Sequence, residues 1–225
     1  MASLQPLFNL ECIRQIRLIC KHDVGHLTGS FDRRLWSKHI SNIYPVLARN
    51  FWSHGNKKIN LVDILGAEPE ILFPARSLRD AETSLICKHY YSLSLVDDVT
   101  LTIEDDALLR TDSLPVLADL IGIAEYNDCY IDLGSLSGLE KCGKSMLSSL
   151  GHRIYVQPIG LTRTTAAYLI NPNLAALLAN TYWPCALPAD LHHQRLLWIN
   201  EINGLWPEHS IFDNLSILGV FPSTI

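Results

Sequence analysis

The chain has 225 residues, 48% of them hydrophobic, and a formal net charge of -5. This length and composition predict a globular protein with a substantial core, and an acidic balance without a run of lysine and arginine argues against binding to nucleic acid. Six cysteines without a CxxC pair predict reduced thiols in a cytoplasmic protein. No apolar stretch approaches the roughly 20 residues that cross a bilayer.

Short apolar, β-branched segments alternate with helical patterns along the chain. This alternation predicts one α/β domain over residues 1–225, with a mostly parallel sheet flanked by helices. The expected strands are residues 17–20, 59–65, 99–103, 129–133, 154–157 and 167–170.

Four helices are expected between these strands. Each is indicated by a capping residue or a proline at its start and by apolar residues at helical spacing. They begin at Ser77, near Asp112, at Asn171 and at Pro188, and the last runs through Trp198.

Three consecutive carboxylates, Glu104, Asp105 and Asp106, directly follow the expected strand 99–103. Ligands of open α/β sheets bind at the carboxyl ends of the strands. Residues spaced like Glu104 and Asp106 point the same way from an extended segment, so they can share one divalent ion, and carboxylate oxygens favour Mn²⁺ or Mg²⁺ over zinc. Such an ion stabilises charge on a nucleotide diphosphate leaving group. The alternative is a solvated turn or the acidic first turn of a helix.

Several short motifs, in order, resemble glycosyltransferase family 25, which includes bacterial lipopolysaccharide and capsule glycosyltransferases. A family helix is matched at Glu82 and His89, and an aspartate that precedes a Leu-Gly pair in the family corresponds to Asp128 or Asp132. The resembling segments are AETSLICKH at 81–89, TIEDDA at 102–107, IDLGS at 131–135, TAAYLINPNLAALL at 165–178 and LPADLHHQ at 187–194.

The resemblance implies a GT-A-like fold and a metal-dependent transfer of a hexose to a hydroxyl of a lipopolysaccharide or capsule glycan, with inversion. Galactose from UDP-galactose is the first expectation. It also implies that Glu104 and Asp106 hold the metal and the diphosphate and that Asp105 supports the ribose or the donor sugar. Glu82 and His89 are then assigned to the donor site as well.

The same resemblance makes Asp190 the general base that removes the proton of the acceptor hydroxyl. An ordinary helix N-cap is the alternative role for this residue. A lipid-linked acceptor would be met at the inner face of the cytoplasmic membrane, with at most peripheral membrane contact.

Two other functions stay open from the sequence. Residues 138–145, GLEKCGKS, satisfy the P-loop pattern of nucleotide phosphotransferases, and residues 144–151 would then form the short helix that follows. A catalytically silent relative of the glycosyltransferases, acting as a binding protein, is the second alternative.

Histidines supply further candidates. His192, His193 or His209 would complete the metal or diphosphate shell, since imidazole binds Mn²⁺, or they are simply exposed polar residues. His89 lies on the apolar side of its helix, where a hydrogen-bonded core histidine is the alternative to a site residue.

Overall fold

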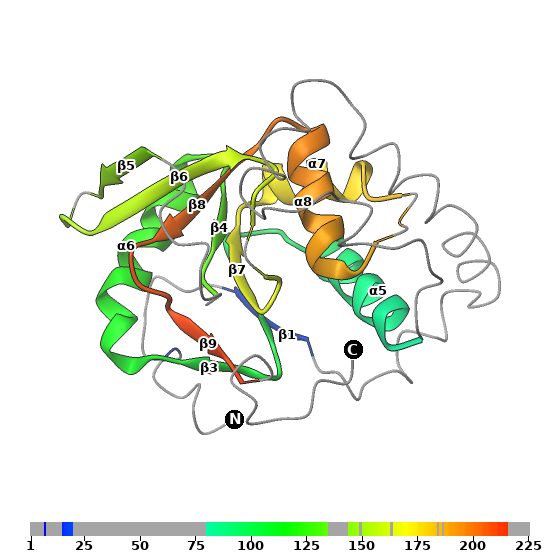
Figure 1. The fold of residues 1–225 in the computed structure, drawn as a ribbon, viewed down its shortest axis with the longest axis horizontal. Helices are drawn as coiled ribbons and strands as arrows, with labels where there is room; N and C mark the ends of the chain where they lie inside the picture. The colour runs from blue at the N-terminus through cyan, green and yellow to red at the C-terminus, as the bar shows by residue number, and fades with distance from the viewer. Residues whose placement is uncertain are drawn as a thin grey trace, which may run out of the picture.

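The structure is a computed structural model. It describes residues 7, 15–19, 80–134, 144–148, 150–162, 164–183, 185 and 187–215. They form an α/β fold built on a seven-stranded mixed sheet with the strand order β1-β2-β7-β4-β8-β6-β5 (Figure 1). Strands β3 and β9 form a separate two-stranded sheet. No described helix is long and apolar enough to cross a membrane.

The described strands occupy the following residues: β1 Gln15–Ile19, β2 Thr100–Glu104, β3 Ala107–Leu109, β4 Tyr130–Asp132, β5 Lys144–Leu147, β6 Arg153–Ile159, β7 Ala167–Ile170, β8 Asn203–Pro207 and β9 Phe212–Asn214. The expected strands at 17–20, 99–103, 129–133, 154–157 and 167–170 are therefore confirmed within a few residues. The expected strand at 59–65 lies outside the described residues.

The prediction of a mostly parallel sheet is wrong. Among the described strands of the large sheet, only the β1–β2 and β4–β8 pairs are parallel, and the other four neighbouring pairs are antiparallel. The continuous apolar runs indicated parallel strands because such runs are typical of sheets that are covered on both faces. Both faces of β2, β4 and β7 are indeed covered, but strand direction is set by the connections, including the hairpin between β5 and β6.

The described helices are α5 (Asp80–Ser94), α6 (Leu114–Tyr126), α7 (Pro172–Asn180) and α8 (Ala189–Ile199), with a 3-10 turn at Thr111–Ser113. These bounds confirm the three helices expected after residue 110, whereas Ser77 lies outside the described residues. Asn171 caps α7 as predicted, because its side chain accepts a hydrogen bond of 2.9 Å from the backbone N–H of Leu174.

Two hydrophobic clusters lie on opposite faces of the sheet. One is built from α6 with Leu101, Ile103 and Leu169, and the other from α5, α7 and α8 with Tyr168 and Ile170. Figure 1 shows α6 on one side of the strands and the other three helices on the opposite side. Successive residues of β7 thus enter different clusters, as the two-residue period of a strand requires.

The segment Lys144–Leu147 forms strand β5, which pairs antiparallel with β6, and not the beginning of a helix. A P-loop needs its Lys-Ser pair at the start of a helix whose backbone N–H groups hold the phosphates. The prediction of a helix after the P-loop motif is therefore wrong. The phosphotransferase alternative consequently lacks the structural context that a P-loop requires.

We expect the Leu101→Ala variant to lose about 2 to 5 kcal/mol of unfolding free energy, because this side chain is fully buried in the core beside α6. Leu108→Ala is the control: Leu108 is 38% exposed on β3, so its loss should stay below about 1 kcal/mol. Urea unfolding followed by circular dichroism measures both. Equal losses would contradict the assignment of β2 to the core.

Candidate active site

The candidate site lies at the sheet edge that is formed by the ends of the strands, not at an outer strand. Three segments meet there. Strands β2 and β4 run in the same direction and end at Glu104 and Asp132, while β7 runs the opposite way between them. The residue Thr165, two positions before β7, therefore reaches the same edge. The resembling motifs around residues 104, 132 and 165 are brought together here, at the carboxyl ends of β2 and β4.

Glu104 is almost completely buried, with its carboxylate facing α5. Its Oε1 lies 3.2 Å from Nε2 of His89, whose Nδ1 lies 3.2 Å from the hydroxyl of Tyr168. In the tautomer with the proton on Nε2, His89 donates to Glu104 and accepts from Tyr168. His89 is thus a hydrogen-bonded buried histidine, which is the alternative considered from the sequence, and it is a direct partner of Glu104.

The hydroxyl of Thr165 lies between two carboxylates. Its Oγ1 is 2.6 Å from Oε1 of Glu104 and 2.7 Å from Oδ1 of Asp190, and the backbone N–H of Thr165 donates to the same Oδ1 at 2.7 Å. A hydroxyl has one proton, so it donates to one carboxylate at a time. The contact between the hydroxyl oxygen and the other carboxyl group is favourable only when that other carboxyl group carries a proton and donates it.

Asp190 lies in the first turn of α8, whose N-cap is Pro188. The N-cap alternative is therefore wrong, since the carboxylate accepts its hydrogen bonds from Thr165 instead. The residue keeps an exposed surface although protein atoms crowd around its carboxylate. That burial raises the pKa of Asp190, the negative charge of Glu104 raises it further, and the hydrogen bonds from Thr165 oppose the shift.

The three residues of the acidic cluster differ in how far they are exposed. Glu104 and Asp106 are each 5% exposed, whereas Asp105 between them is exposed on the turn that joins β2 to β3. Among the described residues, no three His, Cys, Asp or Glu side chains are close enough to hold an ion. Mg²⁺ is commonly bound by one or two carboxylates plus substrate phosphates and water. Glu104 and Asp106 therefore do not form a preformed cage, and an ion held by them would need phosphate or water oxygens as further ligands.

The other predicted residues divide into buried and exposed ones. Glu82 is 1% exposed on α5, seven residues and so two helical turns before His89, which places both on one face. His192 and His193 are completely buried, so the expectation that neighbouring histidines are exposed is wrong for this pair. His209 is exposed near the end of β8.

Sequence reasoning missed an aromatic layer beside the carboxylates. The ring of His193 lies 5.0 Å from that of His89, its Nδ1 is 3.2 Å from the hydroxyl of Tyr130, and Tyr130 stacks on Tyr168 at 5.0 Å. Apolar strands containing a tyrosine gave no sign of this layer, because it forms only when α5 and α8 cover the same sheet face.

Asp132, one of the two aspartates that the resemblance left open, organises the segment before β7. Its carboxylate accepts hydrogen bonds from the Thr162 hydroxyl at 2.6 Å, from the Thr164 N–H at 3.2 Å and from the Gly134 N–H at 3.0 Å. These bonds fix the segment that leads to Thr165. Asp128 instead accepts a hydrogen bond from the side chain of Asn171, so Asp132 is the aspartate that belongs to the site edge.

Comparison with known proteins adds no relative: neither the family models nor the curated proteins contain a match to this chain.

We expect the unfolding free energy to fall as pH drops below about 6.5. Burial lowers the pKa of His192 to about 3, helped by the positive charge of Arg195, and it lowers the pKa of His193 as well. Below the unfolded-state pKa of about 6.5 the unfolded chain binds protons that the folded chain refuses, at a cost of up to about 1.4 kcal/mol per pH unit and histidine.

The measurement is urea unfolding at several pH values between about 7 and 5. His192→Phe keeps a ring against Tyr182, whose ring lies 4.5 Å away, and should flatten the slope. His209→Gln, at an exposed histidine, should leave the slope unchanged. If His192→Phe shows the wild-type slope, His192 is not held neutral in the folded protein.

Proposed function

We propose that the chain is a metal-dependent glycosyltransferase of GT-A-like fold, which transfers a hexose with inversion to a hydroxyl of a lipopolysaccharide or capsule glycan. One observation supports this most directly. Glu104 and Asp190, which the resemblance assigns to the donor and the acceptor side, contact the same Thr165 hydroxyl at 2.6 and 2.7 Å. A carboxylate for the leaving group and a carboxylate for the incoming hydroxyl must be neighbours in such a reaction.

On the donor side, Glu104 and Asp106 would hold Mn²⁺ or Mg²⁺ against the diphosphate, with Asp105 toward the ribose or the sugar. The ion stabilises the charge of the departing nucleotide. His89 restricts the Glu104 carboxylate to one orientation through its 3.2 Å contact, and the hydroxyl of Tyr168 in turn fixes the imidazole ring.

On the acceptor side, Asp190 is the base that takes the proton from the attacking hydroxyl. Its raised pKa suits this role, because a base is most effective when its pKa approaches the working pH. The hydrogen bond from the backbone N–H of Thr165 holds the carboxylate in place. UDP-galactose is the first donor to test, and a lipid-linked glycan of the cytoplasmic membrane is the proposed acceptor.

Binding of the donor should raise Tm only when the metal is present. At about a hundred times its Kd, a ligand adds about 2.7 kcal/mol of stability, which corresponds to roughly 5 to 10 °C for a chain of this size. A thermal-shift panel of UDP-, GDP- and CMP-sugars with and without Mn²⁺ measures this. Asp106→Asn should abolish the metal-dependent part. A panel without any metal-dependent shift would remove the proposed donor site.

Asp190→Asn should keep donor binding and lose transfer by about 10²- to 10⁴-fold. The amide oxygen can still accept from the backbone N–H and the hydroxyl of Thr165, so the local geometry is preserved, but an amide cannot take up the proton. Release of UDP from UDP-galactose in the presence of a lipopolysaccharide preparation measures turnover.

The matched control is Asp112→Asn, because that side chain is 76% exposed and lies outside the site. It should turn over like the wild type. Normal turnover in Asp190→Asn would exclude Asp190 as the base. Metal-dependent donor binding without turnover in the wild-type chain, across acceptors, would identify a silent binding protein instead.

A further inference from the structure

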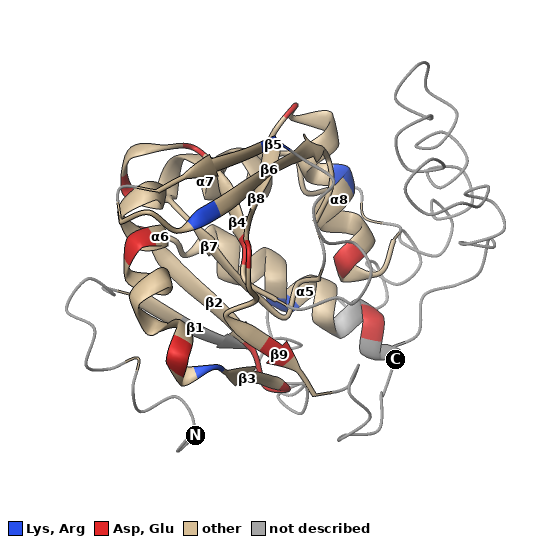
Figure 2. Ribbon diagram, turned by 60° about the vertical axis from the view of Figure 1, so that its left-hand side comes forward, with Lys and Arg blue, Asp and Glu red and all other residues tan. Residues whose placement is uncertain are grey.

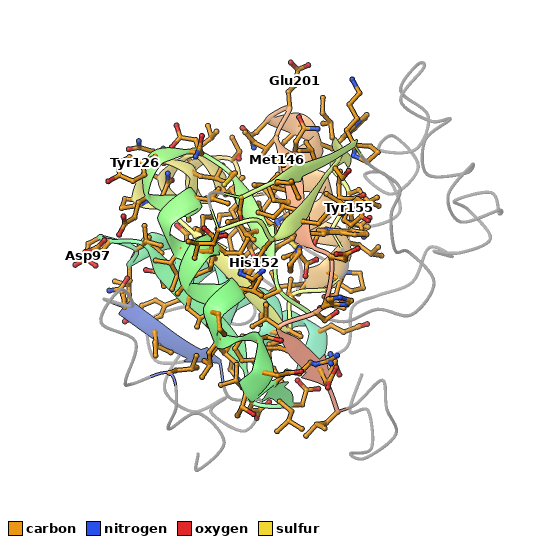
Figure 3. The ribbon with its side chains drawn as sticks, turned by 90° about the vertical axis from the view of Figure 1, so that its left-hand side faces the viewer. Asp97, Tyr126, Met146, His152, Tyr155 and Glu201 are labelled. Atoms are coloured by element: carbon orange, nitrogen blue, oxygen red, sulfur yellow. The ribbon has the colours of Figure 1, made fainter. Side chains whose placement is uncertain are left out.

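Helix α8 is fastened to the segment that precedes β7. Nε2 of Gln194 donates a hydrogen bond of 3.1 Å to the carbonyl oxygen of Thr162. Gly160 lies so close to the helix that a Cβ atom on it would come within 2.6 Å of the Cβ of Trp198. The two helix residues are four positions apart and therefore lie on one face. Beyond the helix, Glu201 points away from the protein (Figure 3). These two contacts fix α8 relative to the segment.

The first turn of α8 adds a third contact on the same face. Asp190 lies four positions before Gln194, and its Oδ1 accepts from the N–H of Thr165 at 2.7 Å and lies 2.7 Å from Oγ1 of the same residue. Asp190 and Arg195 are the two residues of α8 with a carboxylate or a guanidinium group, and Figure 2 shows them as its coloured bands. The carboxylate of the helix therefore reaches Thr165 from a backbone that is already held in place.

Thr165 is held from the opposite side by the last residue of β2. The backbone N–H of Glu104 donates to the carbonyl oxygen of Ala166 at 2.7 Å, and Oε1 of Glu104 lies 2.6 Å from Oγ1 of Thr165. The hydroxyl oxygen of Thr165 thus contacts both carboxylates. The carboxylate oxygens of Glu104 and Asp190 can then be no further apart than two hydrogen-bond lengths laid end to end.

We infer that the Thr165 hydroxyl is a positioning group, which sets the spacing between the carboxylates of Asp190 and Glu104. This inference rests on the proposed function, in which Asp190 serves the acceptor and Glu104 the donor. A single hydrogen bond from the backbone leaves Oδ1 of Asp190 free to swing about its donor, whereas a second contact from the same residue fixes its place. Reacting atoms must meet at about 3 to 3.5 Å, and a displacement of about 1 Å costs about a hundredfold in rate.

The test compares Thr165→Val with Thr165→Ser in the release of UDP from UDP-galactose. Valine keeps the shape of threonine and its backbone N–H, and His89 still contacts Glu104, so each carboxylate retains a partner. We expect kcat of Thr165→Val to fall by about 10- to 100-fold, while KM for UDP-galactose changes by less than about threefold. Thr165→Ser restores the hydroxyl and should come within about threefold of the wild-type kcat. If the valine variant fails to fold, Thr165→Ala, which leaves room for water, takes its place.

A double variant separates positioning from a general loss of structure. If the hydroxyl acts through Asp190, Thr165→Val combined with Asp190→Asn should be no slower than Asp190→Asn alone, because the base that it positions is already lost. General damage would instead multiply the two losses. Thr181→Val is the matched control, because it removes a hydroxyl that donates to the carbonyl oxygen of Leu177 at 3.0 Å, outside the site. It should turn over like the wild type.

Wild-type kcat in Thr165→Val, no recovery in Thr165→Ser, or multiplied losses in the double variant would each overturn the inference. The proposed function would survive all three outcomes, because the wild type still turns over in each. No turnover of the wild type with any acceptor would instead remove the proposed transfer, and the positioning role with it. The activity of the wild type therefore distinguishes the two failures.

Discussion

The site depends on the buried carboxylate of Glu104, which must be hydrogen-bonded or ion-paired. Glu104 ends a central strand with its side chain only 7% exposed, and a carboxylate in such a place is costly unless hydrogen-bonded or paired. Its partners come from α5 through His89 and from the segment before β7 through Thr165. Because Thr165 also contacts Asp190, the position of α8 is tied to Glu104 as well. Four elements far apart in the sequence are thereby fixed around one oxygen atom.

The alternation of residues along β2 links this site to the core. Leu101 and Ile103 enter the cluster beside α6, so Thr100, Thr102 and Glu104 face the opposite helices. There the Thr102 hydroxyl lies 3.2 Å from that of Ser92 on α5, one helical turn after His89. The site is thus the end of a polar row between strand and helix, and a shift of the register by one residue would turn Glu104 into the apolar layer.

Local signals predicted the helices and most buried strands. Asn171 with Pro172 marked the start of α7, and the family-like motifs identified Glu104, His89 and Asp190, which do meet. Strand direction could not be predicted, because burial on both faces is compatible with either direction. The burial of His192 and His193 was missed for a related reason. Two adjacent polar residues are typical of an exposed helix face, and only the packing of α8 against Tyr182 and Tyr130 covers them.

The described residues around Thr165, 160–162 and 164–166, belong to no helix or strand, so side-chain hydrogen bonds must hold Thr165 in position. Asp132 binds the segment from the sheet, and Gln194 of α8 donates to the carbonyl oxygen of Thr162 at 3.1 Å from the other side. A Cβ atom on Gly134 would come within 2.5 Å of Oγ1 of Thr164, so this glycine permits the close approach. The Asp-Leu-Gly sequence, which begins with the last residue of β4, therefore contributes to the site indirectly. It holds the segment that places one threonine hydroxyl between two carboxylates.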